Sequence, residues 1–215
     1  MDKAQELEKL RQEMVADKKL PLKTNLVFGE GNPDCQVLFI GEAPGAVEDE
    51  LVRPFVGRSG QLLRKNIREL GWKEEDVYIT NIVKRRPPEN RDPLPEEIMA
   101  YKPYLTRQIE ILNPKIIVTL GRFSMNYFLP EAKITRDQGR LFEAKIVNKG
   151  PDGNTIADPR FLLDKKLRRN QEKTWFVAPM FHPAAALRGT TMMEAFQKGF
   201  KNLPKMLKKI EELKS

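Results

Sequence analysis

Three residues of different chemistry stand at the ends of apolar runs. Glu42 follows Val-Leu-Phe-Ile-Gly, Asn81 lies in the run that starts at residue 77, and His182 follows the run that starts at residue 175. A carboxylate can take a proton from water, an amide presents a donor beside an acceptor, and a neutral imidazole can donate to a developing anion. Together they could recognise a polar ligand and activate water.

Each of the three also has a purely structural interpretation. Glu42 could cap the following helix, Asn81 could satisfy a turn, and His182 could be a hydrogen-bonded loop residue. The stretch Gly-Glu-Ala-Pro-Gly at residues 41–45 follows an apolar run, and open α/β sheets bind ligands after such strands. An ordinary strand-to-helix turn has much the same composition, so this stretch alone does not decide the matter.

The elements that would position these residues can be predicted from the apolar pattern. Four apolar runs predict strands that are buried on both faces, as in a parallel sheet. They are residues 37–41, 77–83, 116–120 and 175–178. Apolar residues three and four apart predict helices at residues 2–15, 61–70, from 95, after 121 and from about 191. Residues 46–60 are expected to form a long loop, and residues 139–147 could form a strand of a local hairpin.

Strands alternating with helices predict an α/β fold: a three-layer α/β/α sandwich with a central four-stranded parallel sheet. Right-handed crossovers place the helices on the two faces and the loops after the strands along one edge. We therefore expect Glu42, Asn81 and His182 to meet at that edge. The length of 215 residues suits one core, so we expect a single domain over 1–215 with a surface insertion at about 148–173.

Composition narrows the function classes. The net charge of +8 favours polyanionic partners. Cys35 is the single cysteine and His182 the single histidine, which excludes an internal disulfide, a cysteine-based cluster and a multi-histidine metal site. No apolar run approaches the roughly 18 residues of a membrane span, and the first residues have no apolar signal core. We expect a cytoplasmic protein without a membrane partner.

Several loops, taken together, resemble those of family 4 uracil-DNA glycosylases. The matching motifs are G-E-A-P-G-A-V-E-D at 41–49, P-F-V-G-R-S-G at 54–60, T-N-I-V-K at 80–84, R-P-P-E-N-R at 86–91 and H-P-A-A-A-L-R at 182–188. Their order and spacing are also similar to those of the family. The likeness covers most of the chain from residue 29 to residue 188, except for the insertion.

The resemblance implies a monofunctional hydrolase that flips uracil out of DNA, cuts its N-glycosidic bond and leaves an abasic site. Glu42 would position or activate the attacking water, Asn81 would pair with uracil O4 and N3–H, and His182 would hydrogen-bond O2. Phe55 would stack on the flipped base. Glu48 would lie beside the edge of the base and help to exclude the wrong pyrimidine.

The resemblance also implies further contacts. The expected substrate-binding residues besides these are Gly41, Ala43 and Gly45, and the expected DNA-binding residues are Arg58, Ser59, Lys84, Arg86 and Arg188. Some other branches of the superfamily place an aspartate at the position of Ala43, which leaves the activator of the water open. The implied partner is uracil-containing DNA, single- or double-stranded, with free uracil as product. We expect a monomer that associates with the nucleoid when it binds DNA.

The chain departs from the family in two places. The typical family carries a four-iron cluster on four cysteines, whereas here Arg85 and Tyr101 stand at two of those positions and residues 15–20 lack the N-terminal pair. We therefore expect no cluster and no other cofactor, with packing by Tyr101 and the N-terminal helix in its place. The insertion is the second departure. Its basic residues could bind DNA or form a solvated loop: Lys165, Lys166, Arg168 and Arg169.

Three alternatives stay open. The first is a glycosylase that acts on hypoxanthine or xanthine, and the second is a lesion-binding protein of the same fold with little catalysis. The third is a small-nucleotide enzyme on a flavodoxin-like sheet, which offers no explanation for His182 and Phe55 together.

Overall fold

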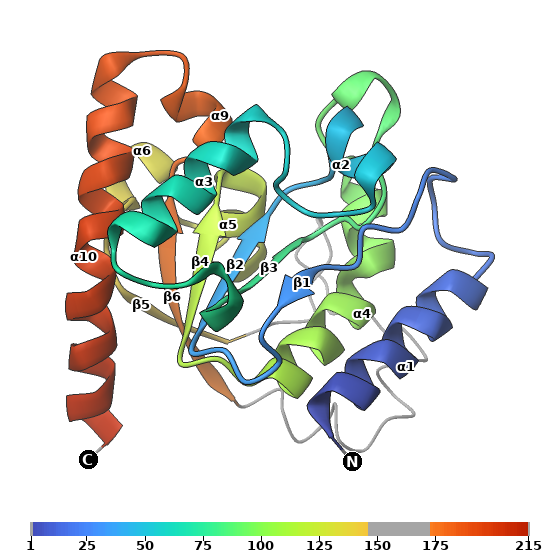
Figure 1. Cartoon of the computed structure of the whole chain (residues 1–215), viewed down its shortest axis with the longest axis horizontal. Helices are drawn as coiled ribbons and strands as arrows, with labels where there is room; N and C mark the ends of the chain where they lie inside the picture. Colours follow the sequence, from blue (N-terminus) through green and yellow to red (C-terminus); the bar gives the residue numbers. More distant parts are fainter. Residues whose placement is uncertain (1, 146–172, 215) are drawn as a thin grey trace.

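Residues 2–145 and 173–214 are described by a computed structural model, in which strands and helices alternate around one sheet (Figure 1). The strands are β1 (Glu30–Gly31), β2 (Val37–Gly41), β3 (Tyr78–Asn81), β4 (Ile116–Leu120), β5 (Phe142–Lys145) and β6 (Thr174–Met180). The α-helices are α1 (Lys3–Ala16), α2 (Ala46–Leu51), α3 (Arg58–Glu69), α4 (Pro95–Leu112), α5 (Arg122–Phe128), α6 (Ile134–Asp137), α9 (Pro183–Ala186) and α10 (Thr190–Lys214). Two short 3-10 turns are η1 (Glu74–Asp76) and η2 (Pro88–Asn90). The expected insertion lies outside the described residues, apart from Lys173.

The sheet has the strand order β1-β3-β2-β4-β6-β5. Its four central strands pair in parallel, as the sequence predicts. The two outer strands, β1 and β5, pair antiparallel with their neighbours and were not expected as parts of this sheet. The strand expected in a local hairpin is β5, and its partner is β6, which lies beyond the insertion.

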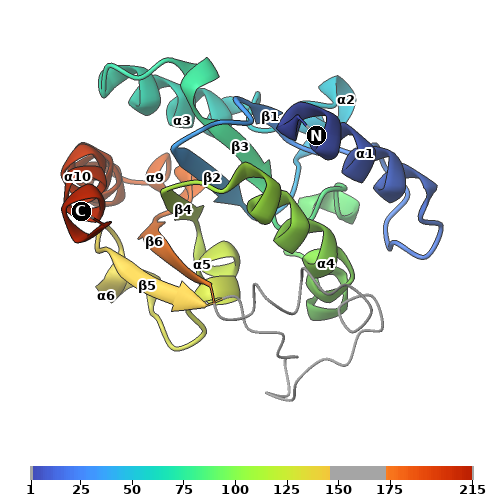
Figure 2. The same cartoon turned by 90° about the horizontal axis from the view of Figure 1, so that it is seen from below.

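Alternate residues of the central strands face two separate cores. Leu38 and Ile40 of β2 pack in the cluster with α1, α4 and α5, whereas Val37 and Phe39 pack in the cluster with α3 and α10. Figure 2 shows these two groups of helices on opposite sides of the sheet. The rings of Phe39 and Phe200 stack with their centroids 5.8 Å apart. Burial on both faces explains why each central strand is apolar throughout.

Some element bounds differ from the sequence-based expectation. Residues 46–51, expected in a loop, form α2, and none of its residues is buried. The helix expected from residue 61 begins at Arg58 as α3. β3 ends at Asn81, two residues early, and β6 runs through Pro179 to Met180. Pro179 is tolerated in β6 because β5 pairs with that strand only as far as Val177.

The first helix packs along α4 (Figure 1), and its buried residues Leu7, Leu10 and Met14 join the core on that face of the sheet. No helix in residues 2–145 or 173–214 is both long enough and apolar enough to cross a membrane.

Candidate active site

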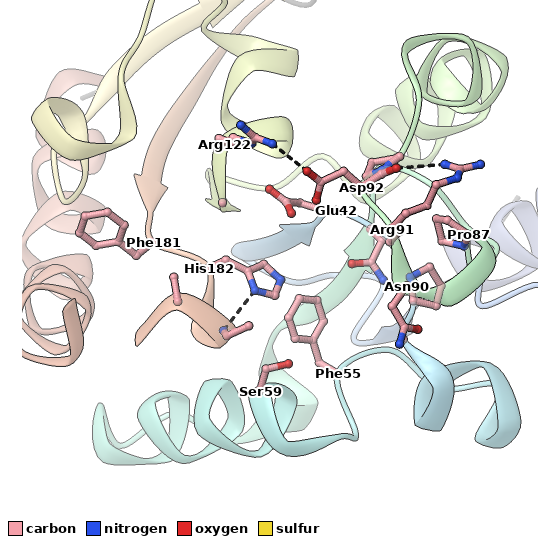
Figure 3. Close-up of a pocket in the computed structure, with 18 of the residues that line it drawn as sticks. Glu42, Phe55, Ser59, Pro87, Asn90, Arg91, Asp92, Arg122, Phe181 and His182 are labelled. Atoms are coloured by element: carbon pink, nitrogen blue, oxygen red, sulfur yellow. Dashed lines mark hydrogen bonds and ion pairs between the residues drawn. The ribbon is translucent and has the colours of Figure 1, made fainter. Parts of the chain in front are cut away.

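A pocket of about 730 Å³ opens at the edge where the four parallel strands end (Figure 3). Gly41 ends β2 and is followed by Glu42, Asn81 ends β3, Gly121 follows β4, and His182 follows β6. Because these ends lie side by side, the structure brings Glu42, Asn81 and His182 together in one cavity. The other expected substrate-binding residues that line it are Ala43, Gly45, Glu48 and Phe55.

Asn81 is almost wholly buried, with 1% of its surface exposed. Its register partner on β2 is Gly41, where any side chain would collide with Asn81 Oδ1 and with the ring of Phe55. Glycine therefore allows the amide and the ring to approach each other. Asn81 Oδ1 accepts no hydrogen bond from the described residues. A buried acceptor without a donor is costly, so this atom indicates a ligand that donates. Because Oδ1 accepts nothing from the described residues, it gives no support to the turn interpretation.

His182 is the N-cap residue of α9, and its Nδ1 accepts a hydrogen bond from the backbone N–H of Ala184 at 3.2 Å. Burial lowers the pKa of His182 to about 4; the charge of Glu48 opposes this shift and that of Arg188 adds to it. The ring is therefore neutral at pH 7. Because Nδ1 is an acceptor, the hydrogen lies on Nε2, which can donate. The cap interpretation and the donor interpretation thus use different nitrogens.

Glu42 does cap a helix, but not the one that follows it in the chain. Its Oε1 accepts a hydrogen bond from the N–H of Phe123, at the start of α5, at 3.1 Å. Gly121 has φ +98 beside it, and a side chain there would collide with the carboxylate. Burial raises the pKa of Glu42 to about 7; the Phe123 bond and Arg122 oppose this shift, and Asp92 adds to it. A carboxyl group with this pKa can exchange a proton near neutral pH.

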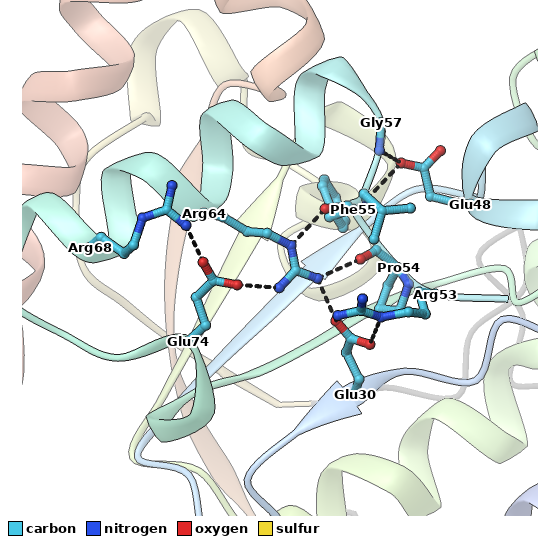
Figure 4. A network of polar contacts seen from close by, with 10 residues as sticks. Glu30, Glu48, Arg53, Pro54, Phe55, Gly57, Arg64, Arg68 and Glu74 are labelled. Atoms are coloured by element: carbon cyan, nitrogen blue, oxygen red, sulfur yellow. Dashed lines mark hydrogen bonds and ion pairs between the residues drawn. The ribbon is translucent and has the colours of Figure 1, made fainter. Parts of the chain in front are cut away.

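Phe55 lines the pocket beside His182, with the two ring centroids 5.9 Å apart. The segment after it is bound by Glu48 of α2, whose Oε1 accepts from the N–H groups of Val56 at 3.0 Å and Gly57 at 2.7 Å (Figure 4). Glu48 therefore lines the pocket and also holds the loop that carries the aromatic ring.

The expected DNA-binding residues differ in their surroundings. Ser59 and the exposed Arg188 line the pocket, and Arg58 is exposed in the first turn of α3. Arg86 is partly buried, and its Nε donates to Oδ1 of Asn90 at 2.7 Å. These four residues lie in the loops or first turns around the pocket.

Lys84 is a correction, because its side chain is fully buried and cannot reach a DNA phosphate. Its Nζ donates to Gln108 Oε1 at 2.5 Å and to the hydroxyl of Thr80. It also lies 5.9 Å from the centre of the Phe28 ring. Burial lowers the pKa of Lys84 well below its usual value. The side chain connects β3 to α4 inside the protein.

Three charged residues of the pocket were missed from the sequence. Arg122 forms an ion pair with Asp92 at 2.7 Å (Figure 3). Arg91 donates to both oxygens of Glu97 at 2.6 and 2.9 Å. Arg91 ends the R-P-P-E-N-R motif at 86–91, and all three residues follow the second or third apolar run, which are the signals that could have found them.

The positions expected to carry a cluster are filled by other side chains. Tyr101 is fully buried and donates from its hydroxyl to the carbonyl of Pro21 at 2.9 Å, while Arg85 donates to the carbonyl of Thr24. Burial raises the pKa of the Cys35 thiol to about 12, which disfavours the thiolate that a metal needs. These residues do not fit an iron–sulfur cluster. Among the described residues, no three of His, Cys, Asp and Glu are grouped to hold a metal ion.

Comparison with known proteins shows the family to which this chain belongs. The family model described as the uracil DNA glycosylase superfamily matches residues 28–211. A type-4 uracil-DNA glycosylase of Sulfurisphaera tokodaii is 41% identical over 92% of this chain and 83% of its own length. Type-4 enzymes of Saccharolobus solfataricus, at 40% over 86% and 77%, and of Thermotoga maritima, at 43% over 77% and 73%, are similar too. The chain therefore belongs to the uracil-DNA glycosylase superfamily.

Proposed function

We propose how the pocket residues of this chain carry out its reaction. The chain is a uracil-DNA glycosylase, which hydrolyses the N-glycosidic bond of uracil in DNA. The observation that carries these roles is the buried, unpaired Oδ1 of Asn81 in one pocket with Phe55, His182 and Glu42. A nucleotide flipped out of the stack would place its base in this pocket and leave an abasic site behind after cleavage.

Asn81 reads the base. Its Oδ1 accepts from uracil N3–H, and its Nδ2 donates to uracil O4. Cytosine has an acceptor at N3 and a donor at C4. In the same amide orientation, Oδ1 would face the N3 acceptor and Nδ2 would face the C4 amino donor, so neither hydrogen bond could form. Leaving the buried Oδ1 unpaired or opposed by a lone pair is costly, which gives the discrimination its energy. Phe55 offers its ring face to the base without any hydrogen-bonding demand.

His182 stabilises the leaving group. When the bond between C1′ and N1 breaks, its electron pair goes to the base, and the uracil anion carries charge towards O2. The Nε2–H of His182 donates to O2, and the backbone N–H of Ala184 on Nδ1 keeps the hydrogen on Nε2. The low pKa of His182 keeps it a neutral donor, so it does not protonate the base outright.

Glu42 acts on the sugar side. Water attacks C1′ as the base leaves, and the proton that this water loses goes to the carboxylate of Glu42. The ionised carboxylate also favours the positive charge that develops on the sugar. The bond from Phe123 to Oε1 fixes the orientation of the carboxyl group for this role.

The remaining contacts belong to the DNA backbone and the base edge. Arg58, Ser59, Arg86 and Arg188 would contact phosphates of the DNA around the flipped nucleotide, which can be in a single strand or a duplex. Glu48 would lie beside the edge of the base as well as hold the loop. Free uracil is the product, the active form is a monomer, and the chain works as one domain in the cytoplasm or on the nucleoid.

The proposed catalytic steps use only side chains of the protein and need no cofactor. The side chains of Arg85 and Tyr101 occupy the cluster positions with hydrogen bonds of their own, and the chain has one cysteine. We therefore place it among the variants of the family without the cluster, and metal analysis of the purified protein tests this assignment.

Single-turnover release of the base from matched oligonucleotides tests the function. Oligonucleotides with uracil, cytosine, hypoxanthine, xanthine or thymine are compared, and alkaline cleavage reports abasic sites. We expect release from uracil alone in the native protein. Asn81→Ala should lower the rate at uracil by about 100-fold while DNA binding changes little, as for the loss of a contact made to the reacting base.

Three outcomes would contradict these roles. Equal loss of DNA binding and base release in Asn81→Ala would exclude Asn81 as the base reader. Release from hypoxanthine or xanthine would favour the altered-specificity alternative. Tight binding to uracil-containing DNA without any release would mean a lesion-binding protein.

A further inference from the structure

Phe55 has an unusual backbone for an aromatic residue. Its φ is +52, in the left-handed region that bulky side chains rarely adopt. Such a conformation is unfavourable and persists only where the surrounding structure holds it. The main chain at Phe55 must therefore be held by specific contacts.

Two charged side chains hold this main chain from opposite sides (Figure 4). Glu48 accepts from the two N–H groups that follow Phe55, as described above. Arg64 of α3 donates from Nε to the carbonyl of Phe55 at 2.8 Å and from Nη2 to the carbonyl of Pro54 at 2.9 Å. The planar guanidinium makes both bonds at once, which a lysine ammonium could not reproduce.

Arg64 is itself fixed in place. Its side chain is 12% exposed and pairs with Glu30 at 2.5 Å and with Glu74 at 2.6 Å. Burial alone would raise the pKa of Glu30, but the bonds from Arg53 and Arg64 outweigh it and lower that pKa. Arg68 pairs with the other oxygen of Glu74. A partly buried charge with two partners in fixed geometry has little freedom to move.

The same face of α3 also receives the main chain of Phe55. Gly60 lies one turn before Arg64, and a side chain at Gly60 would collide with the backbone of Phe55. The glycine lets this backbone rest against the helix, and the guanidinium then binds its carbonyl. The aromatic ring therefore projects into the pocket from a rigid helix and not from a free loop.

We propose that Arg64 is a positioning residue for uracil removal, which sets the Phe55 ring to stack on the flipped base. This proposal rests on the role given to Phe55 in the proposed function. Arg64 is not among the residues that line the pocket, and it binds the carbonyls of Pro54 and Phe55, so its effect should pass through Phe55. Misplacing a stacking ring lowers the rate because the base is then no longer aligned for cleavage.

A mutant cycle tests the proposal with single-turnover rates at saturating enzyme. Arg64→Gln should lower the rate at uracil about tenfold. Arg68→Gln is the matched control, because Arg68 lies on the same helix and in the same ion-pair network, but among the described residues its side chain binds Glu74 and no carbonyl of the loop. It should stay within about twofold of the native rate. In the Phe55→Ala background, Arg64→Gln should add less than about twofold, as expected when both residues act as one unit.

Arg64→Lys tests whether the geometry of the guanidinium or only its charge is needed. It also replaces Arg64→Gln in the experiment if that variant does not fold. It keeps the charge beside Glu30 and Glu74 but loses the paired carbonyl bonds, so it should be as slow as Arg64→Gln. A native rate in Arg64→Lys would overturn the proposal, as would equal losses from Arg64 and Arg68 variants. So would a full loss from Arg64→Gln in the Phe55→Ala background. If Phe55→Ala alone keeps the native rate, the stacking role of Phe55 in the proposed function is wrong. This result therefore distinguishes a failure of the proposed function from a failure of the positioning role of Arg64.

Discussion

Burial acts on Glu42 and His182 in the same way, but the consequences for catalysis are opposite. It disfavours the charged form of both, which raises the pKa of Glu42 to about 7 and lowers that of His182 to about 4. At pH 7 the histidine is a neutral donor, as the departing base requires. The carboxyl group is only about half ionised there, since its pKa matches the pH.

The rate of uracil release should therefore depend on the ionisation of Glu42. The base must be deprotonated to take a proton from water, so the single-turnover rate below saturation should rise from pH 5 to pH 8, with the midpoint of the rise at about pH 7. Glu42→Gln should release uracil more slowly and lack this rise. His182 should add no break above about pH 5, because its own pKa lies below that value.

Two results would contradict this assignment. One is a native rate that stays flat between pH 6 and pH 8. The other is the same rise in Glu42→Gln, which would assign the titration to another group. Asp92→Asn provides a graded check, since the charge of Asp92 raises the pKa of Glu42 and its loss should move the rise to lower pH.

At the scale of elements, Lys84 shows how a basic residue can belong to the core. It lies between β3 and α4, and its depressed pKa means that the unfolded chain binds more protons than the folded chain at pH values below the usual pKa of lysine. Stability therefore falls as the pH falls, by at most about 1.4 kcal/mol per pH unit from this group. Lys84→Met removes this pH dependence. As the pH is lowered from 9 to 6, the free energy of unfolding of the variant should therefore rise relative to that of the native protein.

Urea unfolding at the two pH values measures this difference, and DNA binding by the same variant should be unchanged. A stability difference that does not vary with pH would mean that the lysine titrates normally. Weaker DNA binding with a lower salt dependence would restore Lys84 as a phosphate contact.

The sequence was most informative where elements are buried on both faces. The four central strands could be predicted because each is a short apolar run, and their topology then places Glu42, Asn81 and His182 at one edge. Helix α2 could not be predicted because it has no buried residue and hence no apolar stripe. The structural roles of Lys84 and Arg64 could not be predicted either, because the sequence does not distinguish a buried lysine or arginine from a solvent-exposed one.

The whole molecule carries a net charge of +8, but only part of it lies near the pocket. Arg188 lines the pocket and is exposed, just before α10. That helix then runs from the pocket edge to the opposite end of the molecule, where Lys209 is exposed near its C-terminal end (Figure 1). The two cations allow a comparison between a local and a remote charge.

Arg188→Gln should weaken binding to uracil-containing and uracil-free DNA alike, because phosphate contacts carry no base information. The slope of log K against log salt should become shallower by about 0.9 on a duplex and about 0.7 on a single strand, as one phosphate contact is lost. Lys209→Gln removes the same charge far from the pocket and should leave the slope unchanged. If both variants changed the slope equally, net charge and not the pocket rim would govern DNA binding. If neither did, Arg188 would not contact a phosphate, and the DNA path would have to lie on the side of Arg58 and Arg86.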